Sequence, residues 1–167
     1  MTCDSPHNVD RRLAFARSRL LTAALGVAMD AGDRLLDQIV REWAASQRAS
    51  VSALPGSACG ATGIAVKPAN PASAPMRLWV ADDGKHVALS IGGGSWWERA
   101  APLDKQAIVE LLSAIATGHA KEEIRRIGGH IVGRRGRVQL PAGKVLQYGQ
   151  LFGIPGLQWH QVVYEPY

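Results

Sequence analysis

Cysteine is nearly absent from this chain of 167 residues, which has only Cys3 and Cys59. Two cysteines in irregular segments supply neither a disulfide framework nor a cysteine-based metal cluster, so a reducing compartment is the simplest setting. Long apolar runs are also lacking, and none approaches the roughly eighteen uncharged residues of a membrane-spanning helix. The stretch RRLAFARSRLLTAALGVAM resembles a secretory signal in its leading arginines, but it has no suitable cleavage site. We therefore expect a cytoplasmic protein without a membrane partner.

Complete catalytic and cofactor motifs are missing as well. Gly143-Lys144 is followed by Val145 instead of Ser or Thr, so it does not form a phosphate-binding loop of the nucleotide-hydrolase type. The five histidines show no metal-ligand spacing, and the glycine run in IGGGSWW lacks the spacing of a dinucleotide fingerprint. We assign no catalytic, cofactor-binding or metal-binding residue, and we expect no cofactor.

What the chain does have is a concentrated positive charge. Its 19 Lys and Arg residues outnumber 14 Asp and Glu, which gives a net charge of +5. Residues 121–144 contain seven basic and two acidic residues, so their difference of five equals the excess of the whole chain. The seven basic residues are Lys121, Arg125, Arg126, Arg134, Arg135, Arg137 and Lys144. A clustered excess favours an anionic partner more than the same charge scattered along the chain.

The residue patterns divide the chain into three segments. Apolar residues at three- and four-residue spacing predict helix over residues 9–48, with a kink or break near Gly32, so residues 1–48 form an N-terminal helical segment. Residues 49–75 are rich in Ala, Ser, Gly and Pro and predict a linker, in which GIAV is a candidate short strand. Residues 76–167 predict the core domain. The order of elements indicates an α+β fold, with one main helix packed on a largely antiparallel sheet.

Within the core, two alternating runs around Asp83-Gly84 predict a β-hairpin. Asp104 is the expected N-cap of an amphipathic helix, with Gly118 as a breaker and 121–127 continuing as a further helical turn. The segment HIVGRRGRVQLP predicts a second hairpin whose tip is Gly133–Gly136. Trp96 and Trp97 are expected to point to opposite faces of a strand, with one of them exposed.

The glycine-flanked arginine pair is the candidate functional feature. Over eight residues, IVGRRGRV is similar to the G-x-x-G loop of KH domains, but that loop leads into a helix, and RVQLP predicts a strand. We do not assign that family. The leading hypothesis is a small non-enzymatic protein whose basic loop contacts nucleic-acid phosphates. The predicted contact residues are Arg125, Arg126, Arg134, Arg135, Arg137, Lys144 and Trp97.

Two other functions fit the same sequence. A compact α+β protein without catalytic motifs is typical of a protein–protein module such as an inhibitor or immunity protein. A metal-independent ribonuclease needs histidines and a cation, for which His119, His130, His160 and Arg135 have the required chemistry. The apolar stripe of the helical segment also predicts a homodimer, if this stripe is not covered by the core of its own chain.

Overall fold

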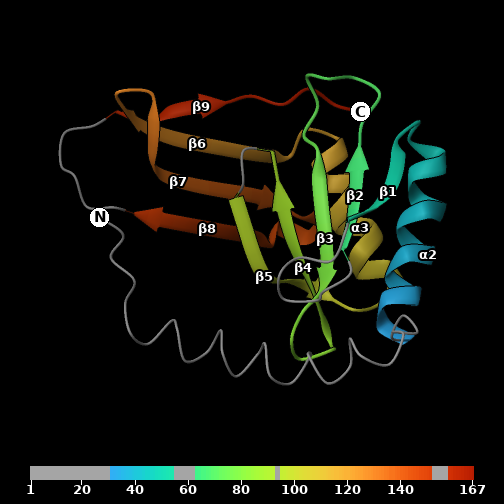
Figure 1. Ribbon diagram of the computed structural model, residues 1–167. Coiled ribbons are helices and arrows are strands. Elements are labelled where there is room, and N and C mark those ends of the chain that lie inside the picture. The colour runs from blue at the N-terminus through green and yellow to red at the C-terminus, as the bar shows by residue number, and fades with distance from the viewer. Residues whose placement is uncertain (1–30, 55–62, 93–94, 152–157) are drawn as a thin grey trace.

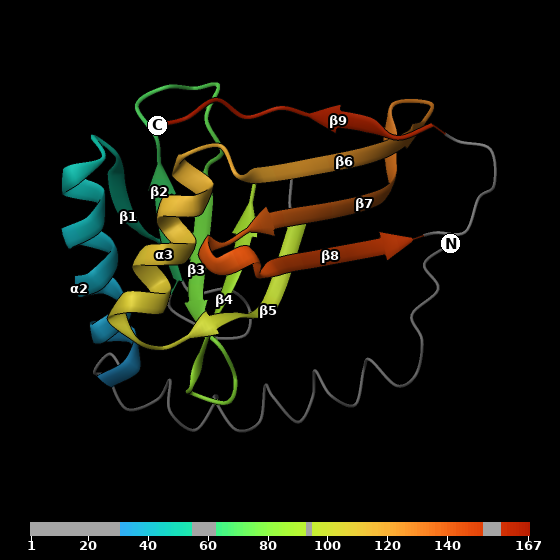
Figure 2. The ribbon, with the colours of Figure 1, turned by 180° about the vertical axis from the view of Figure 1, so that it is seen from behind.

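The computed structural model describes residues 31–54, 63–92, 95–151 and 158–167. Within these residues the chain forms two α-helices and two antiparallel sheets, so the expected α+β class is confirmed. Figures 1 and 2 show the larger sheet at the centre of the molecule and the smaller sheet to one side of it, with the strands of the two sheets running in crossing directions. No helix in these ranges is long and apolar enough to cross a membrane.

The larger sheet has five strands in sequence order, each antiparallel to its neighbours. Asp83 and Gly84 lie in the turn between the third and fourth strands, as the sequence predicts, and Gly84 has the positive φ of 64° that such a turn requires. The strands are β1 (Ser50–Leu54), β2 (Gly63–Lys67), β3 (Met76–Val80), β4 (His86–Ile91) and β5 (Ser95–Pro102).

The smaller sheet has four strands in the order β8-β7-β6-β9. Its strands are β6 (Ala120–Ile127), β7 (His130–Gln139), β8 (Val145–Leu151) and β9 (His160–Val162), with the short 3₁₀ helix η1 (Pro141–Gly143) between β7 and β8. It contacts the larger sheet where β7 and β8 meet β5. The residues on its inward face include Ala120, Glu122 and Val138, all of them buried.

Both helices pack on the larger sheet. α2 (Ala31–Ser46) buries Leu36, Ile39, Val40, Trp43 and Ala44, and α3 (Lys105–Ala116) buries Ile108, Leu111, Leu112 and Ile115. Asp104 is the N-cap of α3, accepting a hydrogen bond from the Ala107 amide at 3.0 Å. α2 contacts α3, β1 and β3 of its own chain, so residues 31–46 give no reason to expect a dimer. The earlier part of the predicted helical segment lies outside the described residues.

The linker prediction is wrong for Ser50–Leu54, whereas the candidate strand GIAV, within Gly63–Lys67, is confirmed. These residues form β1 and β2, which pair with each other and attach to β3. Local composition suggested a linker because small residues pack poorly on their own, but Gly63 lies opposite Trp79, whose indole occupies the space where a Cβ would be. A large cross-strand neighbour therefore supplies the packing that the glycine lacks.

The C-terminal residues link the two sheets. Glu122 of β6 is 1% exposed and accepts a hydrogen bond from the Tyr164 hydroxyl. A side chain at Gly92, the residue after β4, would overlap that hydroxyl. Tyr167 donates a hydrogen bond to the Ala74 carbonyl at 2.6 Å and packs against Trp43, with ring centroids 5.8 Å apart.

Removing a core side chain of α3 tests this packing. Leu111 is fully buried, and we expect Leu111→Ala to lower the free energy of unfolding by about 2–5 kcal/mol, because it loses apolar contacts and leaves a cavity. The measurement is equilibrium denaturation in urea. Leu35→Ala is the control. Because Leu35 is 41% exposed on α2, this substitution should lower the free energy of unfolding much less. Equal losses in the two variants would contradict the burial of the α3 face.

Candidate functional site

The outward side of the four-stranded sheet gathers positive charge. The register places Lys121 opposite Arg137, and Arg137 opposite Gln147. It also places Glu123 opposite Arg135 and Gln161. Because alternate residues of a strand face the same side, all these side chains share the face opposite to buried Glu122 and Val138. We call this surface the basic face: Lys121, Arg125, Arg135 and Arg137, with Glu123, Gln147, Gln161 and Trp159.

Trp159 holds two of the cations in place. The guanidinium carbons of Arg125 and Arg135 lie 4.3 and 4.5 Å from its ring centroid, within the range of cation–π attraction. A Cβ at Gly133 would lie 3.5 Å from the tip of the indole, at ordinary contact distance. The indole therefore packs against β7 at Gly133, between the two arginines.

Arg135 also forms an ion pair with Glu123. Its Nη2 donates to Oε1 of Glu123 at 2.9 Å, and its Nε donates to Oε2. These hydrogen bonds lower the pKa of Glu123 and raise the pKa of Arg135. The positive charge of Lys121 also lowers the pKa of Glu123. Both groups are therefore ionised at neutral pH, and the arginine is held in a fixed orientation.

Lys121 and Arg137 differ from these anchored arginines. They lie directly opposite each other, both exposed, and neither forms an ion pair with any residue that the structure describes. Like charges at opposed positions of an antiparallel pair repel each other. Both residues line an open hollow of about 470 Å³, together with Glu123, Arg135, Gly136, Gln147, Tyr148 and Gln161. An anion in this hollow would relieve the repulsion.

The structure brings together only three of the predicted contact residues, namely Arg125, Arg135 and Arg137. Arg134 pairs with Ile124, on the opposite side of the sheet from Arg135. Arg126 donates to the Gly129 carbonyl at 3.2 Å, beside the β6–β7 turn. Lys144 is exposed at the corner between η1 and β8.

The predicted hairpin tip at Gly133–Gly136 is wrong, because these residues lie within β7. The turn lies at Gly128-Gly129, which have φ of 52° and 84°. Two consecutive positive φ angles are what a tight hairpin turn requires, and adjacent glycines adopt them without strain. The predicted helical continuation over 121–127 is also wrong, since this segment is β6 and pairs with β7 along its length.

Trp97, the remaining predicted contact residue, does not lie on the basic face. Trp97 is 7% exposed and packs against Tyr148, with ring centroids 5.9 Å apart. Its register with Leu89 places it on the inward face of the larger sheet. Sequence reasoning missed Lys121, Trp159, Gln147 and Gln161 as members of the basic face. The alternation of charge in AKEEIRRI would have indicated the face of Lys121, had that segment been recognised as a strand.

The histidines of the ribonuclease hypothesis lie apart. His119 precedes β6 and His130 begins β7 at the other end of the same hairpin. His160 pairs with Ile124, a position on the opposite side of the sheet from Arg135. In the described ranges no three His, Cys, Asp or Glu residues are grouped so that they could hold a metal ion.

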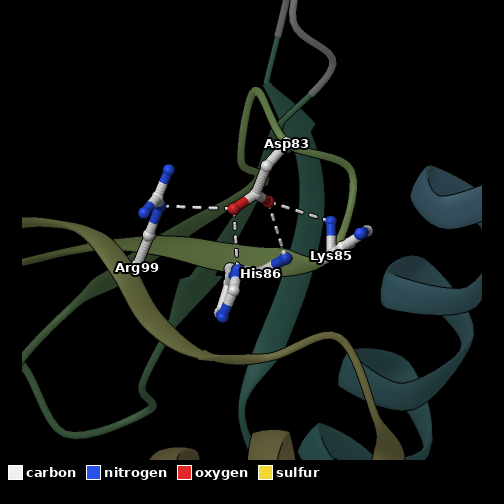
Figure 3. Close-up of polar contacts among 4 residues, drawn as sticks. All are labelled: Asp83, Lys85, His86 and Arg99. Carbon is white, nitrogen blue, oxygen red and sulfur yellow. Dashed lines mark hydrogen bonds and ion pairs between the residues drawn. The ribbon is translucent and has the colours of Figure 1, made fainter.

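A second polar cluster surrounds Asp83 in the β3–β4 turn (Figure 3). Its carboxylate accepts hydrogen bonds from the Lys85 amide at 2.9 Å, the His86 amide at 3.0 Å and His86 Nδ1 at 2.8 Å. Arg99 of β5 brings its Nε to 3.2 Å from the same carboxylate. The bond from the Lys85 amide is the largest cause that lowers the pKa of Asp83 to about 2, and His86 adds to it.

This pKa predicts how stability depends on pH. A carboxylate with a pKa of about 2 in the folded chain and an ordinary value of 3.8 stabilises the fold above about pH 4, and this contribution is lost as pH falls toward 2. Asp83→Asn should therefore flatten the fall in stability between pH 4 and 2, measured by thermal unfolding. Asp82→Asn removes a charge from the same turn without removing these hydrogen bonds and is the matched control. An unchanged slope in Asp83→Asn would contradict the cluster.

The chain matches no known protein family, and the comparisons with curated proteins and with solved structures found no significant similarity.

Proposed function

We propose that the basic face binds the phosphates of a nucleic acid and that the protein acts as a small non-enzymatic binding protein. The observation that carries the proposal is the pairing of exposed Lys121 and Arg137 on adjacent strands, without an ion pair in the described part of the chain. A phosphate backbone is a repeating anion that can neutralise several such cations at once. Arginine and lysine supply most contacts of this kind.

The anchored arginines complement the two free cations. Arg135 is oriented by Glu123 and Trp159, so less side-chain entropy is lost when it contacts a phosphate. Arg125 is oriented by the same ring. Gln147 and Gln161 add neutral hydrogen-bonding groups on the same face. The surface thus combines two anchored arginines with two exposed cations on one face of a sheet, which suits recognition of a nucleic-acid backbone independent of base sequence.

A pair of double variants with equal charge change tests the location of binding. Lys121→Ala/Arg137→Ala removes two cations from the basic face, whereas Arg134→Ala/Lys144→Ala removes two cations that lie elsewhere. We expect the first variant to weaken binding to a mixed-sequence oligonucleotide and to reduce the slope of log affinity against log salt by roughly 1.4–1.8. The second variant should change both much less. Fluorescence anisotropy over a salt series measures the two quantities.

The same assay distinguishes nucleic acid from an acidic protein partner. Polyglutamate of similar charge serves as the competitor, since it offers carboxylates without phosphates. Competition as effective as that of the unlabelled oligonucleotide would show that the basic face selects charge alone, and the nucleic-acid proposal would be overturned. Equal losses in the two double variants would show that net charge, and not this face, determines binding.

A further inference from the structure

A second hollow lies where the two sheets meet. It measures about 320 Å³ and is lined by Trp97, Glu98 and Arg99 of β5 and by Gln147 and Tyr148 of β8. Gln147 and Tyr148 also line the hollow of the basic face, so the two hollows are neighbours that share a wall. A ligand bound along the basic face can therefore extend into this junction hollow.

The chemistry of the junction hollow differs from that of the basic face. Two aromatic side chains, Trp97 and Tyr148, contribute to its wall, with their rings inclined at 58°. Glu98, Arg99 and Gln147 surround them with a carboxylate, a guanidinium and an amide. The hollow thus offers hydrogen-bond donors and acceptors beside an apolar wall, which is the usual composition of a site for a small planar group.

Two residues in the wall of this hollow carry constrained polar groups, one without an acceptor in the described chain and one held by an ion pair. Trp97 is 7% exposed, yet its indole N–H has no acceptor among the residues that the structure describes. Buried indole N–H groups usually have a hydrogen-bond partner. Arg99 is held on one side by Asp83 at 3.2 Å (Figure 3), and this contact restricts where the rest of the guanidinium can lie.

We infer that the junction hollow is a subsite for a nucleobase, and this inference depends on the proposed binding of phosphates by the basic face. The base carries an exocyclic amino group, which donates to the Glu98 carboxylate, while Arg99 and Gln147 bond its acceptors. Glutamate accepts from base amino groups in this way, and arginine and glutamine form paired bonds with purine edges. The aromatic wall contacts the ring of the base.

This subsite selects single strands. In a duplex, the ring of a base is stacked on its neighbours and its pairing edge is bonded to the other strand. Such a base cannot enter a hollow beside the bound phosphate backbone. A base in a single strand can turn away from its neighbours and enter without breaking pairs. The partner is therefore a single-stranded nucleic acid whose phosphates follow the basic face and whose base lies at the β5–β8 junction.

The first experiment compares two strands of equal length and charge. One is an oligonucleotide of cytosine, and the other has the same backbone with abasic residues, so only the bases differ. We expect the abasic strand to bind at least about fivefold more weakly to the full-length protein, since contacts to a base contribute this much in single-strand sites. Equal affinity of the two strands would overturn the base subsite and leave the phosphate proposal intact.

The second experiment tests whether removing the negative charge of Glu98 strengthens or weakens binding of the strand. If phosphates alone were bound, Glu98→Ala would strengthen binding, because it removes a negative charge near a polyanion. If Glu98 bonds a base, the same change weakens binding to the cytosine strand and leaves the abasic strand unaffected or bound more tightly. Glu110→Ala, an exposed position of α3, removes an equal charge away from both hollows and is the control.

The outcomes separate the two proposals. Salt-dependent binding of both strands with equal affinity, together with tighter binding by Glu98→Ala, supports the basic face and rejects the nucleobase subsite. No salt-dependent binding of either strand rejects both. If Glu98→Ala binds the cytosine strand more weakly than the unmodified protein does, the subsite is supported. The melting temperature of Glu98→Ala should match that of Glu110→Ala. A folding defect would instead weaken the binding of both the cytosine strand and the abasic strand.

Discussion

The register between β6 and β7 is the constraint on which the candidate site depends. It is set by the turn at Gly128-Gly129 together with the irregularity between Arg125 and Arg126, which shifts the pairing by one residue before the basic face. A slip of β7 by one residue would move Arg135 and Arg137 to the inward face and expose Val138. Burial of Val138 against the core therefore keeps Arg135 and Arg137 on the outward face. The pairing of β6 with β7 thus determines both the apolar inward face and the charged outward face.

The junction of the two sheets gives this surface its support. Glu122 and Tyr164 join β6 to the C-terminal residues, and Gly92 leaves space for them beside β4. Trp97 and Tyr148 fill the contact between β5 and β8. These contacts involve groups far apart in sequence, so the orientation of the four-stranded sheet depends on tertiary packing. A rigid platform lowers the entropic cost of binding an extended ligand.

Positive charge is arranged on this platform in two ways. Arg125 and Arg135 are held by an aromatic ring, and Arg135 also by a carboxylate, whereas Lys121 and Arg137 face each other without such a partner in the described chain. Anchored cations give a defined shape to the surface. Lys121 and Arg137 repel each other across the strand pair, and a bound anion would reduce this repulsion.

Several elements could be read from the sequence because their signals are local. The Asp104 cap, the spacing of Ile108, Leu111 and Ile115, and the Asp83-Gly84 turn depend on neighbours within a few residues, and the structure confirms all three. The α+β class followed from the order of such elements. The excess of charge in residues 121–144 was also evident, since it is a property of composition.

The remaining features were decided by contacts between distant segments. Composition predicted a linker where β1 and β2 form, because pairing with β3 and the indole of Trp79 compensate for small side chains. The GRRG segment predicted a turn because glycine is common in turns, yet Gly133 and Gly136 lie within β7 and pair with both neighbouring strands. Sequence determined that the chain carries a basic segment. Only strand register decided that Arg135 and Arg137 share a face with Lys121 while Arg134 turns away, since side-chain direction alternates at every residue.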